Sequence, residues 1–209
     1  MPKPTLLYIA DPMCSWCWGF APQLRRIREA LPHLPVRIVL GGLAPDTEEP
    51  MPSDMRRYVQ QAWDAVETTA GVSFNREFWD GRHADIRRST YPACRAVVLA
   101  RTEGKEMAMF DAIQRAYYLE ARNPSRADVL ADCGEAIGLS LGRQTFLESL
   151  HASTTQSMLE ADLQLRGALG ANTFPSLGLM GTGLPEPGLV LHRGWGTAKE
   201  LVPRLEASL

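Results

Sequence analysis

The sequence of 209 residues lacks the features that mark several large protein classes. It has no run of lysine or arginine and a formal net charge of -2, so it offers no positive field for the phosphates of a nucleic acid. No apolar run approaches the roughly 20 residues that span a bilayer. The apolar run Thr5–Ala10 is too short for the core of a signal peptide. We therefore expect a cytoplasmic protein that binds neither nucleic acid nor membrane.

Cysteine and histidine are also scarce, with four residues of each. Four cysteines are too few to staple a domain of this length, and cytoplasmic thiols are kept reduced. Any disulfide here is therefore expected to be transient and catalytic. Since no two histidines have the spacing of a zinc-binding pair, we predict no metal site.

The N-terminal residues show the pattern of a strand, a helix and a second strand. The apolar runs Thr5–Ala10 and Val36–Leu40 predict two buried strands. Between them, Phe20, Leu24 and Ile27 recur at the spacing of a helix face that packs on a core. Such a unit predicts parallel strands joined by a right-handed crossover.

Residues 46–169 have a helical pattern instead, with Ser53 and Ser125 as expected N-caps. Strand patterns return at Ser176–Met180 and Leu189–Trp195, and a loop rich in glycine and proline between them suits a hairpin. A capping box begins at Thr197 and opens a terminal helix.

This element order predicts an α/β protein with a thioredoxin fold, in which a mixed sheet is flanked by helices and interrupted by a large all-helical insertion domain. The predicted core comprises residues 1–45 and 170–209, and the insertion comprises residues 46–169.

The pair Cys14 and Cys17 lies where the first strand leads into the first helix. Free amides and the positive end of the helix dipole favour the thiolate of Cys14, which makes it the expected nucleophile. Cys17, one turn later, can resolve a mixed disulfide between Cys14 and a substrate. Zinc sites also use two cysteines at this spacing, but zinc usually needs two such pairs, and the other cysteines stand alone.

The stretch DPMCSWCWGF, residues 11–20, resembles the active-site segment of DsbA-like oxidoreductases, in particular their cytoplasmic FrnE-type branch. The segment Thr173–Ser176 is similar to the cis-proline loop of that family. The resemblance implies a disulfide oxidoreductase or isomerase with a cis bond before Pro175, where the preceding backbone pairs with an extended peptide substrate. The expected substrate-binding residues are Ser15, Trp16, Phe174 and Pro175.

The resemblance also implies partners that are thiols or disulfides of proteins or small molecules. No cofactor is expected beyond a redox-active disulfide, with glutathione as a candidate co-substrate. DsbA has a histidine between its cysteines, whereas Ser15 and Trp16 carry no charge. We therefore predict a reduction potential nearer to about -270 mV, as in thioredoxin, than to about -120 mV, as in DsbA.

Several alternatives stay open at the level of individual residues. Asp11 suits either proton transfer with Cys17 or an Asx turn before Pro12. Trp16 is expected at the rim of the substrate site. Cys94 and Cys133 are expected to be buried and inert, the alternative being a second, regulatory disulfide.

Two other functions also remain open. Kappa-class glutathione transferases and 2-hydroxychromene-2-carboxylate isomerases share the split core but use a hydroxyl group near the first cysteine position. A peptide-binding chaperone would use the apolar rim alone. The sequence determines neither the physiological substrate, nor the direction of exchange, nor the oligomeric state.

Overall fold

A mixed sheet forms the centre of the molecule in the computed structural model, which describes residues 4–81, 86–87, 89–181 and 183–209. Its strands in the described residues are β1 (Thr5–Ala10), β2 (Val36–Leu40), β3 (Ser176–Met180) and β4 (Leu189–Arg193). The strand order is β2-β1-β3-β4. β1 is parallel to β2 and antiparallel to β3, which is antiparallel to β4. The predicted parallel pair and the predicted hairpin are thus confirmed.

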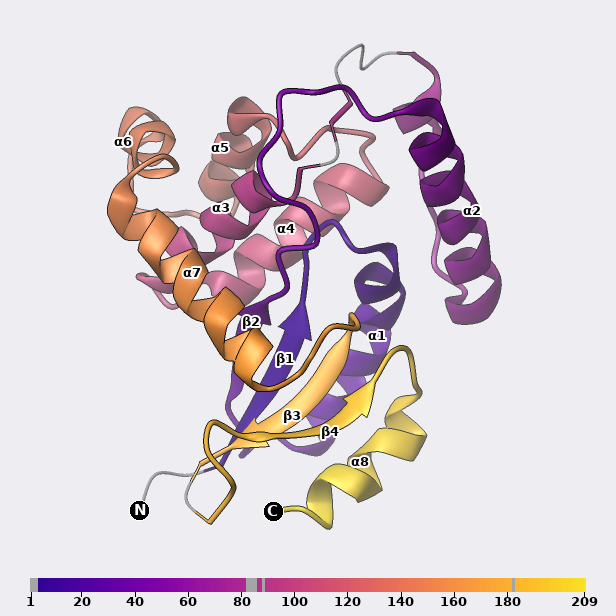
Figure 1. Cartoon of the computed structure of the whole chain (residues 1–209), viewed down its shortest axis with the longest axis vertical. Coiled ribbons are helices and arrows are strands. Elements are labelled where there is room, and N and C mark those ends of the chain that lie inside the picture. Colours follow the sequence, from indigo (N-terminus) through magenta and orange to yellow (C-terminus); the bar gives the residue numbers. More distant parts are fainter. Residues whose placement is uncertain (1–3, 82–85, 88, 182) are drawn as a thin grey trace.

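The regular elements found between β2 and β3 are all helical (Figure 1). Outside this segment, α1 (Ser15–Ala30) lies between β1 and β2, and α8 (Ala198–Glu206) follows β4. The helices between β2 and β3 are α2 (Ser53–Ala70), the short 3-10 helix η1 (Arg76–Trp79), α3 (Tyr91–Arg101), α4 (Glu106–Tyr118), α5 (Ala127–Ala136), α6 (Arg143–Ser149) and α7 (Ser153–Ala168). This confirms a thioredoxin fold interrupted by a helical segment. The exact domain boundaries stay a prediction. In the described part of the chain, no helix is both long and apolar enough to cross a bilayer.

Alternate residues of β1 belong to two hydrophobic clusters, one on each face of the sheet. Leu6 and Tyr8 are buried in a cluster that includes residues of α1, α8 and several inserted helices. Leu7 and Ile9 pack on the opposite face against the segment at and beyond the end of α7. Figure 1 shows α1 and α8 on one side of the sheet and α7 on the other. Successive residues of β1 point to opposite faces of the sheet, and both faces are buried. This explains why the apolar run is continuous.

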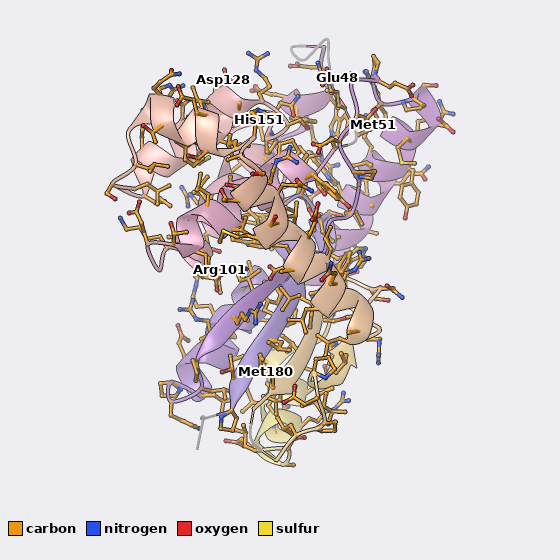
Figure 2. The ribbon with its side chains drawn as sticks, turned by 60° about the vertical axis from the view of Figure 1, so that its left-hand side comes forward. Glu48, Met51, Arg101, Asp128, His151 and Met180 are labelled. Carbon is orange, nitrogen blue, oxygen red and sulfur yellow. The ribbon has the colours of Figure 1, made fainter. Side chains whose placement is uncertain are left out.

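The outer edge of β2 is covered by side chains of the helical segment. Glu106 accepts a hydrogen bond from the Ile38 amide at 3.3 Å, and the fully buried Asp162 accepts one from the Leu40 amide at 3.1 Å. Arg101 donates to the Ile38 carbonyl at 2.9 Å and to Asp162 at 2.7 Å. Figure 2 labels Arg101 where the helices meet the sheet. These side chains satisfy backbone groups that an edge strand would otherwise leave unpaired.

The helix caps agree with the sequence in one case and differ in two. The capping box of Thr197 and Glu200 is present at the start of α8. The N-cap expected at Ser53 is wrong, because Pro52 precedes the helix and no side chain caps it. The N-cap expected at Ser125 is also wrong, because α5 starts two residues later and the Ser125 hydroxyl donates to the Ser89 carbonyl at 3.1 Å.

Candidate active site

Cys14 is the N-cap residue of α1, and its side chain makes no capping bond. The chain reaches this position through a tight turn, in which the Cys14 amide donates to the Asp11 carbonyl at 3.1 Å. Pro12 suits the second position of such a turn because its φ angle is preset. The sulfur is thus placed at the end of the helix where the amides are free and the dipole is positive, which favours a negative charge there.

The two thiols of the motif lie side by side but differ in exposure. Cys14 is 8% exposed and Cys17 is fully buried, and their side chains are in hydrogen-bonding contact as free thiols. Burial, together with the nearby Cys14, raises the pKa of Cys17 well above its ordinary value. A substrate can therefore reach Cys14 first, whereas the fully buried Cys17 can attack only a sulfur that is already bonded to Cys14.

The loop before β3 faces Cys14 although it lies 160 positions further along the chain. Its Phe174–Pro175 peptide bond is cis, in agreement with the resemblance. The Cys14 thiol points at the Phe174 carbonyl with a separation of 3.8 Å. The Gly194 amide holds the Pro175 carbonyl at 2.8 Å, and the Phe174 ring lies over Gly41. The loop is therefore fixed from both sides, with backbone presented beside the sulfur.

Asp11 is fully buried and its carboxylate accepts hydrogen bonds from several elements. One oxygen accepts from the Met13 amide at 2.9 Å, which is the predicted Asx turn. The other accepts from the Leu43 amide and the Thr90 hydroxyl, each at 2.7 Å, and from the Cys94 thiol at 3.6 Å. Burial raises the pKa of Asp11, and these hydrogen bonds oppose the rise. The residue therefore ties three segments together beneath the motif, and its predicted proton transfer stays a prediction.

The side chains between and after the cysteines are half-buried. Ser15 and Trp16 begin α1 beside Cys14, and Trp16 packs against two hydrophobic clusters. Trp18 stacks on Tyr118 with ring centroids 5.6 Å apart, and its indole donates to the Ser73 carbonyl at 3.1 Å. Trp18 thus packs into the protein, while Trp16 keeps the exposure that the predicted rim requires.

The two remaining cysteines are buried free thiols. Cys94 touches Asp11, and burial raises its pKa well above the ordinary value. Burial also raises the pKa of Cys133 to about 11. Both environments suit inert thiols, because only a thiolate reacts readily. Among the described residues, no group of three or more His, Cys, Asp or Glu side chains is arranged to hold a metal ion.

Three residues that contribute to the site were not identified from the sequence. Tyr8 lies in the apolar run of β1, but its hydroxyl is near Cys17, 3.5 Å from the carbonyl of that residue. Thr90 holds Asp11 from 79 positions away. Gly41 provides the space that the Phe174 ring fills. The signal available for Tyr8 was a phenol in an otherwise apolar strand, three residues before Asp11. The sequence offered no signal for Thr90 or Gly41.

A sequence model described as thioredoxin matches residues 7–192 of the chain. Among solved structures, the fold is similar to that of a candidate protein disulfide isomerase from Nitrosomonas europaea, with a TM-score of 0.85 and 28% identity, covering 99% of this chain and 97% of that one. It is also similar to the cytosolic disulfide reductase DsbM from Pseudomonas aeruginosa, solved with glutathione. That match has a TM-score of 0.78 and 27% identity, and covers 98% of each chain.

A curated relative is the ClpXP adapter protein SpxH of Shouchella clausii, 24% identical over 195 residues. The match covers 90% of this chain but only 61% of that protein. The family model spans most of the sequence, and the similar solved structures carry the names of disulfide oxidoreductases. The chain therefore belongs to the thioredoxin family and is one of its DsbA-like members.

Proposed function

We propose that the protein is a cytoplasmic dithiol-disulfide oxidoreductase in which Cys14 attacks and Cys17 resolves. The observation that carries this proposal is the position of the Cys14 sulfur, which lies at the start of α1, touches Cys17 and faces the Phe174 carbonyl. Helix amides stabilise the attacking thiolate, a second thiol lies within reach, and free backbone lies where an extended substrate would bind.

The proposed reaction has two exchanges. The Cys14 thiolate attacks a substrate disulfide, so that one substrate sulfur becomes bonded to Cys14 and the other leaves as a thiolate. The Cys17 thiol then loses its proton and attacks the Cys14 sulfur, which forms the Cys14–Cys17 disulfide and releases the second substrate thiolate. The substrate gains two electrons and the cysteine pair loses them. The reverse sequence oxidises a dithiol substrate.

We further propose glutathione as the small-molecule thiol that reduces the Cys14–Cys17 disulfide. Two glutathione molecules would supply the two electrons and leave as glutathione disulfide. The support is the similarity to the reductase DsbM, whose structure was solved with glutathione. Ser15, Trp16, Phe174 and Pro175 are the proposed contacts, because the first two follow Cys14 at the start of α1 and the last two form the cis-proline loop that faces its sulfur.

Trapping the mixed disulfide tests this proposal. Cys17→Ser protein incubated with glutathione disulfide should accumulate one adduct on Cys14 that dithiothreitol removes, because no second thiol can release it. Cys14→Ser protein should form no such adduct, and Cys133→Ser should behave as wild type. Equal adduct formation in a Cys14→Ser/Cys17→Ser double variant would contradict the proposal. A peptide-binding chaperone would form no adduct with either single variant.

A further inference from the structure

A small cavity lies between α1 and α4, beneath the sheet residue Tyr8. Its volume is about 40 Å³, which is enough for a small number of water molecules. Tyr8 and Gln114 form its inner wall and are each 1% exposed. Arg25, Arg28 and Asp111 also line it, and they are exposed at the surface. The cavity therefore extends from the centre of the protein toward solvent.

Gln114 has a buried polar group that water in this cavity would satisfy. Its side-chain nitrogen is buried and has no hydrogen-bond partner among the described residues. A buried amide without a partner loses the hydrogen bonds it would make in solvent, so such groups are normally satisfied by protein or by ordered water. The cavity that Gln114 lines is polar and has room for that water.

Tyr8 connects the cavity to the active site. Its hydroxyl donates to the Cys17 carbonyl at 3.5 Å and is also in hydrogen-bonding contact with the Cys17 side chain. Burial, followed by the nearby Cys17 and Cys14, raises the pKa of Tyr8 well above its ordinary value, so the phenol stays protonated. A neutral hydroxyl can accept a proton on its oxygen while it donates its own.

Cys17 needs such a connection because it is fully buried and must lose a proton before it can attack. The charged and titratable groups around it are Cys14, Asp11, Tyr8 and Tyr118. The Asp11 oxygens already accept from two amides, a hydroxyl and a thiol, which occupy about four acceptor positions. Of these four groups, Tyr8 is the one that lines the cavity.

We propose that Tyr8, Gln114 and water in this cavity form a proton relay between the Cys17 thiol and solvent at Asp111. The inference rests on the proposed function. In the resolving step, the Cys17 proton passes to the Tyr8 oxygen while the Tyr8 proton passes to water held by Gln114. The Cys17 thiolate then bonds to the Cys14 sulfur, the bond from Cys14 to the substrate breaks, and the substrate leaves as a thiolate. One proton thus reaches solvent, the cysteine pair is oxidised and the substrate is reduced.

The test compares the two exchange steps by rapid quenching and mass spectrometry across pH. Tyr8→Phe removes the relay hydroxyl and keeps the ring that packs on Phe20 and Phe110. Gln114→Met removes the amide and keeps a similar volume. Tyr117→Phe is the matched control, because it removes another buried tyrosine hydroxyl that does not line the cavity.

Both relay variants should slow resolution of the Cys14 mixed disulfide about 10-fold or more near neutral pH and reduce its solvent deuterium isotope effect. The rate of the first attack, measured in a Cys17→Ser background, should stay at the wild-type value in each case, and the control should match wild type in both steps. Resolution at the wild-type rate in both relay variants would overturn the relay, as would equal slowing in Tyr117→Phe. A wild-type protein that forms no mixed disulfide would overturn the proposed function instead.

Discussion

The packing of Phe174 on Gly41 makes a defined perturbation of the cis-proline loop possible. A Cβ atom added at Gly41 would lie 2.6 Å from the tip of the Phe174 ring, and 2.8 Å from two further ring carbons. The backbone at Gly41 has no positive φ angle, and the three atoms nearest to the added Cβ are all carbons of the Phe174 ring. To restore an ordinary contact of 3.4 Å, the ring must withdraw by about 0.8 Å. Gly41→Ala therefore displaces the residue whose carbonyl faces the Cys14 sulfur.

We expect Gly41→Ala to lower the free energy of unfolding by about 1–3 kcal/mol, which is the usual cost of overpacking. Because displacements near 1 Å can cost up to about 100-fold in rate, we expect disulfide exchange to slow about 10- to 100-fold. Urea denaturation and the rate of adduct formation with glutathione disulfide measure the two effects.

A double variant separates the ring contact from other causes. In a Phe174→Ala background the added methyl group meets no ring, so Gly41→Ala should cost less than about 0.5 kcal/mol and change the rate little. Gly167→Ala is the control, because Gly167 is an exposed helical position with open space around it, where alanine should stabilise the protein by up to about 1 kcal/mol. Wild-type stability and rate in Gly41→Ala, or the same loss with and without the ring, would refute this reasoning.

Three further predictions concern stability, pH and thiol reactivity. Asp162→Ala removes the acceptor of the Leu40 amide and one of the two carboxylate partners of Arg101, so urea denaturation should show a loss of about 2–4 kcal/mol. The more exposed Asp132→Ala should cost under about 1 kcal/mol, and equal losses would contradict this prediction. Because burial raises the pKa of Asp11, the unfolding free energy of wild type minus that of Asp11→Asn should fall as pH rises above about 4. A constant difference would show that folding does not raise this pKa. Native protein at pH 8 should be alkylated by iodoacetamide at Cys14 well before Cys94 or Cys133, because burial raises the pKa of Cys94 well above its ordinary value and that of Cys133 to about 11. Rapid native labelling of either buried thiol would contradict this prediction.

The sequence predicted those parts of the fold that depend on local pattern. The strands at Thr5–Ala10, Val36–Leu40 and Ser176–Met180 have the predicted bounds, because short apolar runs between turns suit buried strands. The capping box at Thr197 depends on residues three positions apart and was also predicted correctly. The caps at Ser53 and Ser125 were not, since a hydroxyl group near a helix start has other partners available once the chain is folded.

The candidate site was predictable where its residues share a motif and not where the fold brings them together. Cys14 and Cys17 could be placed because their spacing matches one turn of a helix that begins at the motif. The partners of Asp11 could not be predicted, because Thr90, which precedes α3, and Cys94, within α3, lie far along the chain. Tyr8 was assigned to the core on the basis of its strand, which is correct for its ring and incomplete for its hydroxyl.

The most direct test of the central claim is an equilibrium titration of the protein in glutathione redox buffers, followed by acid quenching, alkylation and mass spectrometry. The account predicts one two-electron transition in which Cys14 and Cys17 lose their thiols together while Cys94 and Cys133 keep theirs. The midpoint should lie nearer to about -270 mV than to about -120 mV. A midpoint above about -150 mV would contradict the predicted potential, and alkylation of both Cys14 and Cys17 in fully oxidising buffer would contradict the redox function itself.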